Sequence, residues 1–292
     1  MLENSFKLVS DPRTLYLTNT LKDTTDKVHF TIQKRLGLTC ILGDIGLGKT
    51  SVLRLLHWQY EDDKENYITT IIPTPKFSSD FAMLKQICAD FDVPAKRSFY
   101  EQQKAFEIWL AKKYQENKNV VVFIDEAQKL KNQELELIRI MLNLETYDHK
   151  LIQIILAGQL ELREKLLDPK NKALYSRVFT PSVLSPLTLD EAKRMIAFRC
   201  HIFEMENPFN DESIELLYQQ TKGIPREIVK LVLESYRLSI KDSIPITPQL
   251  IQTASKQLME THNEETGNGT YKVRRYTQTQ TKSKTKKSKS SK

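Results

Sequence analysis

The chain has 292 residues, of which 40% are hydrophobic and 28% are charged, enough apolar material for the core of one large domain or two smaller ones. No apolar run approaches the roughly 18 residues of a membrane span, and the N-terminus has no charged-then-apolar signal pattern, so we expect a cytoplasmic protein with no membrane partner. The cysteines Cys40, Cys88 and Cys200 are far apart and form no C-x-x-C pair, which argues against a disulfide framework and a zinc site.

The net charge of +7 is carried by the C-terminal segment. Residues 263–292 contain seven lysines and two arginines against two glutamates, so this segment alone accounts for +7 and the rest of the chain is neutral. It has neither periodicity nor apolar content, and we expect it to be disordered. It is either a solubilising end or a salt-sensitive arm for nucleic acid or another polyanion.

Near the N-terminus, an irregular lead-in around Asp11-Pro12 is followed by a segment with helical periodicity over residues 18–34. This segment arrives just before the glycine-rich stretch described next. Leu15, Tyr16 and Leu17 could therefore wall a nucleobase, although ordinary packing is the simpler role for each of them.

A glycine-rich stretch lies between an apolar run at residues 38–42 and a helix-like segment at residues 50–60. Its glycines, lysine and threonine fit the spacing G-x-x-x-x-G-K-[ST] of the phosphate-binding loop. Backbone N–H groups at such a helix start cradle phosphates, Lys49 reaches the β- and γ-phosphates, and the Thr50 hydroxyl binds Mg²⁺. The predicted nucleotide-binding residues are Gly43, Asp44, Ile45, Gly46, Leu47, Gly48, Lys49, Thr50 and Ser51.

Further along the chain, apolar runs alternate with helix-like segments. Strands are predicted over residues 67–72, 120–124, 151–158 and 183–187, and helices over residues 81–91, 100–114, 132–145 and 160–167. The run from Val120 to Ile124 is continuously apolar, as expected for a strand that is buried on both faces. The fold class is therefore α/β, with a parallel sheet sandwiched by helices.

Two carboxylates follow that buried strand. Ligands of α/β sheets bind at the carboxyl ends of the strands, and this is where Asp125 and Glu126 lie. Asp125 is suited to hold Mg²⁺ through water, and Glu126 to orient and polarise the water that attacks the γ-phosphate. Gln159 follows the next strand, where it either approaches the γ-phosphate or caps a helix. The pattern predicts ATP hydrolysis with Mg²⁺.

The alternation of strands and helices ends near residue 187. Four consecutive helices are predicted over residues 189–203, 211–220, 224–240 and 247–260. Arg226 comes directly after Pro225 at the start of the third helix. Because proline fixes the local backbone, the arginine can be aimed across a cleft between two domains.

Seven segments of the chain together resemble the AAA+ ATPases. They are FKLVSDPRTLYL, GDIGLGKT, FIDEA, IILAGQLELR, YSRV, SPLTLDEA and TKGIPREI, in this order. The similarity covers roughly residues 5–260 and is greatest to the branch that contains the secretion ATPase ExeA/GspA and the transposition ATPases TnsC, TniB and MuB. It implies a lead-in and helix, a P-loop AAA+ domain, a small helical lid and a tail, which we expect at residues 1–36, 37–187, 188–262 and 263–292.

The resemblance assigns roles to three polar residues. Gln159 matches the sensor-1 position, and Arg226 matches sensor 2, which links the lid to the γ-phosphate. Arg177 matches the arginine finger, which enters the neighbouring subunit's site and can be worth ~10³–10⁵ in rate; a surface salt bridge is the alternative. A finger supplied by a neighbour implies head-to-tail self-association into a ring or a helical filament.

The resemblance also implies a role in transposition. The protein would oligomerise on duplex DNA with ATP and recruit or activate a transposase at a target site, together with target-selection proteins. Lys96 and Arg97 match approximately the region where such proteins face DNA, unless they form only a solvated loop. Two alternatives stay open: an ExeA/GspA-like ATPase that assists secretion-system assembly, and an ATP-controlled interaction switch in a defence or partition system.

Overall fold

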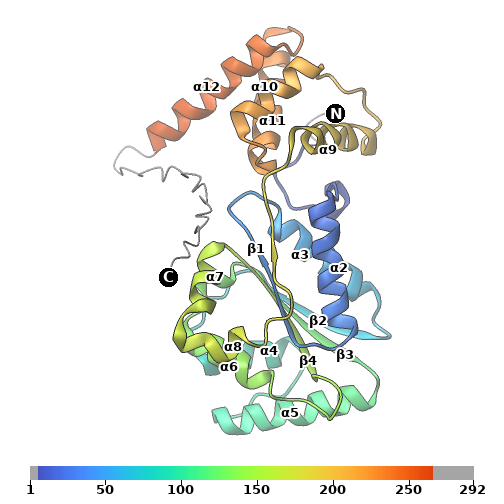
Figure 1. Ribbon diagram of the computed structural model, residues 1–292, viewed down its shortest axis with the longest axis vertical. Helices are drawn as coiled ribbons and strands as arrows, with labels where there is room; N and C mark the ends of the chain where they lie inside the picture. Colours follow the sequence, from blue (N-terminus) through green and yellow to red (C-terminus); the bar gives the residue numbers. More distant parts are fainter. Residues whose placement is uncertain (1–5, 266–292) are drawn as a thin grey trace, which may run out of the picture.

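The computed structural model describes residues 6–265. In this part of the chain, a sheet with helices on both faces forms one end of an elongated molecule, and a group of helices forms the other end (Figure 1). Among these residues, no helix is long and apolar enough to cross a bilayer. Residues 266–292 lie outside the described part, so the prediction of a disordered basic tail stays untested by the structure.

The sheet has five strands, all parallel, in the order β2-β3-β4-β1-β5. Their bounds are β1 (Leu38–Leu42), β2 (Tyr67–Ile72), β3 (Asn119–Ile124), β4 (Ile152–Gly158) and β5 (Ser182–Val183). The three central strands β1, β3 and β4 are buried along their whole length, because helices cover both faces of the sheet. The predicted α/β class, with a parallel sheet between helices, is confirmed.

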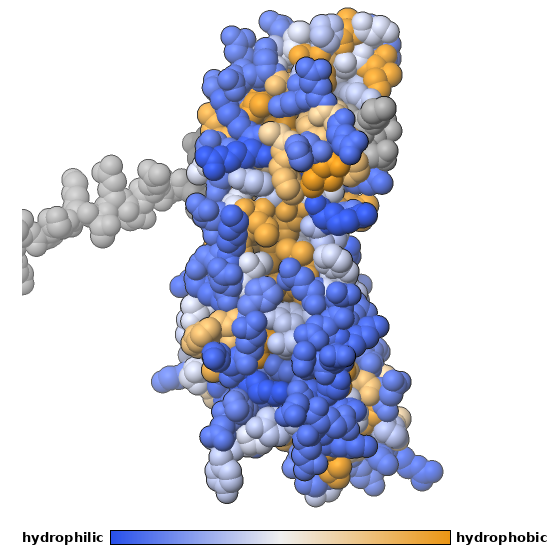
Figure 2. Space-filling view, turned by 90° about the vertical axis from the view of Figure 1, so that its right-hand side faces the viewer, coloured by the Kyte–Doolittle hydropathy of each residue, from blue (hydrophilic) through white to orange (hydrophobic). Residues whose placement is uncertain are grey.

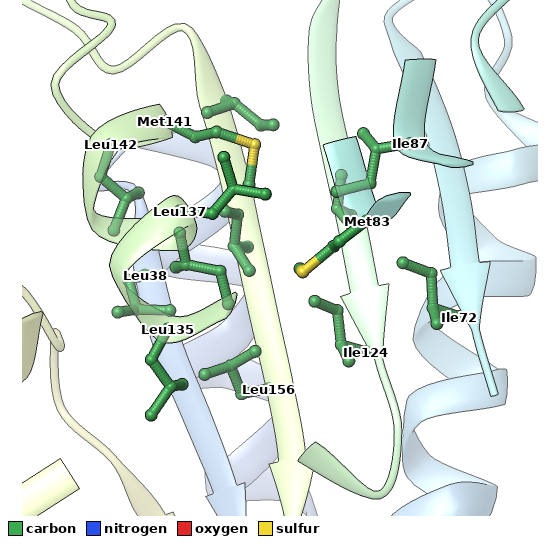
Figure 3. Packing of buried hydrophobic residues seen from close by; sticks show 14 of the residues in the cluster. Leu38, Ile72, Met83, Ile87, Ile124, Leu135, Leu137, Met141, Leu142 and Leu156 are labelled. Atoms are coloured by element: carbon green, nitrogen blue, oxygen red, sulfur yellow. The ribbon is translucent and has the colours of Figure 1, made fainter. Parts of the chain in front are cut away.

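Side chains alternate between the two faces along each strand. On one face, Val122 of β3 and Ile154 of β4 belong to a cluster that includes residues of helices α4 (Asp80–Asp90), α5 (Phe99–Gln115), α6 (Asn132–Met141) and α7 (Leu160–Leu167). Figure 3 shows the part of this cluster in which Met83 and Ile87 of α4 pack over the strands together with Leu135, Leu137 and Met141 of α6. On the other face, Val121 and Phe123 pack with α2 (Asn19–Gln33) and α3 (Lys49–Asp62).

The helical end of the molecule has its own core. It consists of α9 (Leu189–Ile202), α10 (Asp211–Thr221), α11 (Pro225–Asp242) and α12 (Pro248–Glu265). The Thr188 hydroxyl accepts from the Glu191 N–H and the Glu191 carboxylate accepts from the Thr188 N–H, a capping box that begins α9 at the predicted place. Phe6 from the N-terminal segment is fully buried in this helical core. The lead-in therefore packs against the helical end, although in the sequence it comes before the sheet.

Two predicted elements are shorter in the structure. The strand expected over residues 183–187 is only Ser182–Val183. Leu184 still donates to the Leu42 carbonyl, but the chain then leaves the sheet, because Pro186 has no N–H and the Leu187 N–H bonds to Gly223 at the helical end. The helix expected over residues 132–145 ends at Met141, and the chain returns through a bridge between Glu145 and Lys150 into β4.

Candidate active site

The phosphate-binding loop lies at the carboxyl edge of the sheet, between β1 and α3. The Gly43 N–H donates to the carbonyl of Gly158 at the end of β4, with N and O 3.3 Å apart, which fixes where the loop starts. Gly48 has a φ of 96° and directly precedes α3, a left-handed conformation that favours glycine. The first N–H groups of α3 therefore face out of the loop, as an anion site requires.

Two side chains of the loop are fixed by short contacts. The buried Lys49 Nζ donates to the carbonyls of Gly43 and Asp44, both at 2.8 Å. The Thr50 Oγ1 donates to Asp125 Oδ2 at 2.7 Å, which joins the loop to the end of β3. Burial lowers the pKa of the Lys49 ammonium, and the nearby carboxylates of Glu126 and Asp125 oppose that shift. The two carboxylates thus favour the charged form of Lys49 in a partly desolvated site.

Glu126 follows Asp125 in a left-handed backbone conformation, with a φ of 52°. Its Oε2 accepts a hydrogen bond of 2.8 Å from Gln128 Nε2 and lies 3.3 Å from Lys129 Nζ. The Gln159 backbone N–H, just after β4, donates to the Oε1 of the same Gln128 at 3.1 Å. The turn after β3 and the end of β4 are therefore linked at the predicted catalytic carboxylate.

A single pocket collects most of the predicted site residues. Its empty volume is about 1120 Å³, including space open to solvent, and Lys49, Thr50, Glu126, Gln159 and Arg226 line it. Residues from the N-terminal segment, from the phosphate loop and from α9 and α11 close it from the other sides. Figure 2 shows hydrophobic side chains gathered at mid-height of one face, between the sheet end and the helical end.

Of the three residues predicted to wall a nucleobase, Leu15 and Tyr16 line the pocket and Leu17 does not. Leu15 and Leu17 both pack against the core between the sheet and α3. Three lining residues from α9, Glu191, Met195 and Arg199, were not predicted. Their only signal in the sequence is a four-residue helical spacing, which ordinary core faces share. Burial lowers the pKa of Arg199 to about 10, against the opposing effect of Asp11.

Arg177 lies away from this pocket. Its Nη1 donates to the carbonyl of Arg139 in the last turn of α6 at 2.7 Å. Two residues later, the Phe179 N–H donates to the carbonyl of Leu38, the first residue of β1, whereas the phosphate loop follows Leu42 at the other end of that strand. A five-residue strand is roughly 13 Å long. Arg177 is thus at the opposite edge of the sheet from the chain's own loop.

Lys96 and Arg97 are also remote from the pocket. They are exposed in the turn between α4 and α5, and the Lys96 N–H donates to Gln102 Oε1 at 2.6 Å. Lys96, Lys104 and Lys112 line a shallow hollow along α5, on the end of the sheet far from α9–α12 (Figure 1). The turn is therefore both basic and held in one conformation by a buried glutamine.

Comparison with known proteins agrees with this geometry. A family model described as an AAA domain matches residues 32–166. General secretion pathway protein A of Aeromonas hydrophila is 29% identical over 234 residues, which cover 77% of this chain and 41% of that protein. The chain therefore spans less than half the length of this curated relative.

Solved structures with the same fold include a protein bound to ADP and a branch migration motor. The ADP form of the Aeropyrum pernix ORC2 protein has a TM-score of 0.64 and 14% identity, with 87% of this chain and 72% of that chain covered. Cdc6p from Pyrobaculum aerophilum has a TM-score of 0.61 and 16% identity, with 87% and 70% covered. The Thermotoga maritima RuvB Holliday junction branch migration motor has a TM-score of 0.56 and 18% identity, with 82% and 68% covered.

The chain has the P-loop AAA+ fold and is an ATPase. In this fold the residues at the loop also fit a magnesium ion, because the Thr50 hydroxyl and the Asp125 carboxylate are adjacent oxygen donors. No group of three or more His, Cys, Asp or Glu in the described residues is placed to hold a metal. Mg²⁺ keeps water and phosphate oxygens as most of its ligands, so it needs few side chains from the protein. When bound, the ion would neutralise charge on the phosphates.

Proposed function

We propose that this ATPase is a nucleotide-controlled assembly switch, in which chains associate head to tail and each pocket is completed by Arg177 of the neighbouring chain. The observation that supports this is the position of Arg177 at the sheet edge opposite its own phosphate loop. A cation there cannot reach its own pocket without refolding, but it can reach the pocket of a chain stacked on that edge. A repeated contact of this kind is head-to-tail and gives a ring or a filament.

In this proposal, different residues around the pocket have different roles in ATP hydrolysis. Water loses a proton to the Glu126 carboxylate while its oxygen bonds to the γ-phosphorus, and the bond from that phosphorus to the bridging oxygen breaks, leaving the electron pair on ADP. Lys49 and Arg226, which line the pocket, balance negative charge on the transferring group. Gln159 holds the turn after β4 close to Glu126 through Gln128.

A mixing experiment tests the intersubunit site. Arg177→Ala and Glu126→Gln should each abolish most turnover alone. A 1:1 mixture should regain activity, because a chain with intact Glu126 then meets an intact Arg177 from its neighbour. Arg163→Ala, a change of an exposed arginine on α7, serves as the matched control and should stay active. A mixture that stays inactive, or Arg177→Ala at full activity, would show that the site is complete within one chain.

We further propose that the assembly assists a secretion system. This use is supported by the similarity to General secretion pathway protein A. In this case the partner is a protein, and duplex DNA has no effect on turnover.

Assembly on duplex DNA for transposition is the second candidate, supported by the exposed Lys96 and Arg97 beside Lys104 and Lys112 and by the basic residues 263–292. ATPase assays with long duplex DNA at low and high salt decide between the two. Stimulation that falls steeply as salt rises, and that weakens when residues 263–292 are deleted or Lys96 and Arg97 are changed to Glu, supports the DNA role. Turnover that DNA leaves unchanged at low salt rejects it and supports a protein partner.

A further inference from the structure

Gln128, two positions after Glu126, contacts both Glu126 and the backbone at Gln159. Gln128 is half-buried in the short 3₁₀ turn η2 (Ala127–Lys129) that follows β3. Both ends of its amide group are engaged: Oε1 with the N–H of Gln159 and Nε2 with the Glu126 carboxylate. One side chain therefore joins two groups that line the pocket.

The orientation of this amide is determined by its neighbours. A backbone N–H can only donate, so the Gln128 oxygen must face Gln159. The NH₂ group must then face Glu126 and donate to its Oε2. The network thus engages one carboxylate oxygen of Glu126 and leaves Oε1 to accept from a water.

The backbone around Gln128 holds this arrangement in place. Lys165 Nζ, from α7, donates to the carbonyls of Gln128 and Leu130, both at 2.6 Å. Gly158, the last residue of β4, lets the amide approach: a Cβ there would lie 3.0 Å from Gln128 Oε1 and 2.8 Å from Leu162 Cδ2. The contact between the turn after β3 and the end of β4 therefore depends on a glycine at that position.

Lys129 also contacts the Glu126 carboxylate, but it does not position that carboxylate as Gln128 does. Its Nζ lies 3.3 Å from the same Oε2, and its side chain is 45% exposed. An exposed pair of this kind is screened by water and salt and is worth little. It also has no contact with β4 among those that the structure describes. Of these two residues, only Gln128 combines a short hydrogen bond to Glu126 with a second one to the backbone just after β4.

From this geometry we infer that Gln128 is a positioning residue for hydrolysis: it orients the Glu126 carboxylate, and it ties Glu126 to the backbone at Gln159 so that both respond together to the γ-phosphate. The inference rests on the proposed role of Glu126 as the group that activates water. Gln128 itself touches neither nucleotide nor water in this scheme. Its loss should therefore lower kcat with little change in KM for ATP.

Two substitutions of Gln128 separate its two hydrogen bonds. Gln128→Met removes both and should lower kcat by about tenfold with KM within about twofold, since general-base catalysis contributes roughly 10²–10⁴ and only its alignment is lost. Gln128→Glu keeps an acceptor for Gln159 but loses the N–H donor that holds Glu126 Oε2. It should therefore also lower kcat with little change in KM, which assigns the effect to the hydrogen bond with Glu126.

The matched control is Gln133→Met, the same chemical change at an exposed position on α6, which should behave as wild type. Binding of a fluorescent ATP analogue and the midpoint of thermal unfolding show that each variant is folded. If Gln128→Met does not fold, the nearly isosteric Gln128→Glu still gives kcat and KM. Wild-type kcat in the Gln128 variants, beside an inactive Glu126→Gln, would overturn this inference alone. Turnover by Glu126→Gln would overturn the proposed role of Glu126 and this inference with it.

Discussion

The backbone N–H of Arg226 donates a hydrogen bond to the carbonyl of Gly46, with N and O 3.2 Å apart. This contact joins the first turn of α11 directly to the middle of the phosphate-binding loop. Gly46 has no side chain to keep the two apart: a Cβ at this position would lie 2.9 Å from Ile224 Cγ2 and 3.1 Å from Arg226 Cβ. A movement of the loop on nucleotide binding should therefore also move the start of α11.

Replacement of Gly46 by alanine should separate the loop from α11. Gly46 has a φ of 84°, so a side chain costs about 1 kcal/mol in backbone strain. The collision with Ile224 should cost at least about 1 kcal/mol more, because a methyl branched at Cβ cannot swing away. We expect Gly46→Ala to lower the free energy of unfolding measured without nucleotide by about 2 kcal/mol or more. Gly48→Ala, with a φ of 96° and no protein atom within 4 Å of the added Cβ, isolates the strain alone. Equal losses in the two variants would mean that the contact between loop and α11 adds no stability.

The sequence predicts the local parts of this site and misses its long-range contacts. Gly43, Lys49 and Thr50 are predictable because one turn and one helix start fix their relative places, and Asp125 because a buried strand must end in the ligand-binding edge. Gln128 is not predictable, because which polar side chain of a turn reaches Glu126 and Gln159 depends on the left-handed backbone at Glu126. A residue pattern does not show that conformation.

The same distinction holds for the fold. The strands over residues 38–42 and 67–72 are predicted with the bounds that the structure has, because hydrophobic runs and prolines mark their ends. The strand order and the short β5 depend on pairing between distant segments, and so does the burial of Phe6 in the helical end. Periodicity along the chain carries no information about such pairings.

The hydrogen bond from Thr50 to Asp125 predicts how magnesium affects nucleotide binding. Thr50→Val removes the hydroxyl but keeps the side-chain shape, so it loses one proposed metal ligand and the contact that orients the Asp125 carboxylate. We expect ATP affinity with Mg²⁺ to fall by about tenfold or more, since a second-shell contact alone is worth that much, and affinity in EDTA to change little. Titration calorimetry in both buffers measures the difference. Thr50→Ser retains the hydroxyl and should behave as wild type; equal Mg²⁺ dependence in Thr50→Val and wild type would rule out Thr50 as a ligand.

Lys222 and Gly223 follow α10, and both have a positive φ. Adding a side chain at Gly223 and removing the side chain of Lys222 should have opposite effects on stability. Gly223 has a φ of 73°, and a Cβ there would lie 2.2 Å from the backbone oxygen of Leu187, whose N–H bonds to the Gly223 carbonyl. Gly223→Ala should therefore destabilise the protein by about 3 kcal/mol or more. Lys222 has a φ of 53° at the helix C-cap, where glycine is preferred, so Lys222→Gly should leave stability unchanged or raise it. Thermal unfolding of both variants measures these effects, and a destabilised Lys222→Gly would contradict the expected relief of strain.

Two histidines, His29 on α2 and His57 on α3, predict that the fold loses stability in mild acid. Burial lowers the pKa of His29, with Asp26 opposing, and burial lowers the pKa of His57, with Glu61 opposing. His29 Nδ1 shares a hydrogen bond of 2.6 Å with the Tyr60 hydroxyl, and burial raises the pKa of Tyr60, so that hydroxyl stays protonated. The folded state thus favours the uncharged ring.

The sign of the pH effect follows from proton linkage. A histidine whose pKa is lower in the folded state than in the unfolded state contributes its full stability above the unfolded value, about 6.5, and loses it as the pH falls below that value. We expect the midpoint of thermal unfolding to fall between pH 7.5 and pH 5.5, and His29→Gln to make this fall smaller by about 2 °C. His201→Gln, at an exposed position on α9, is the matched control and should not reduce it. An equally steep fall in His29→Gln would show that protonation of His29 is not linked to unfolding.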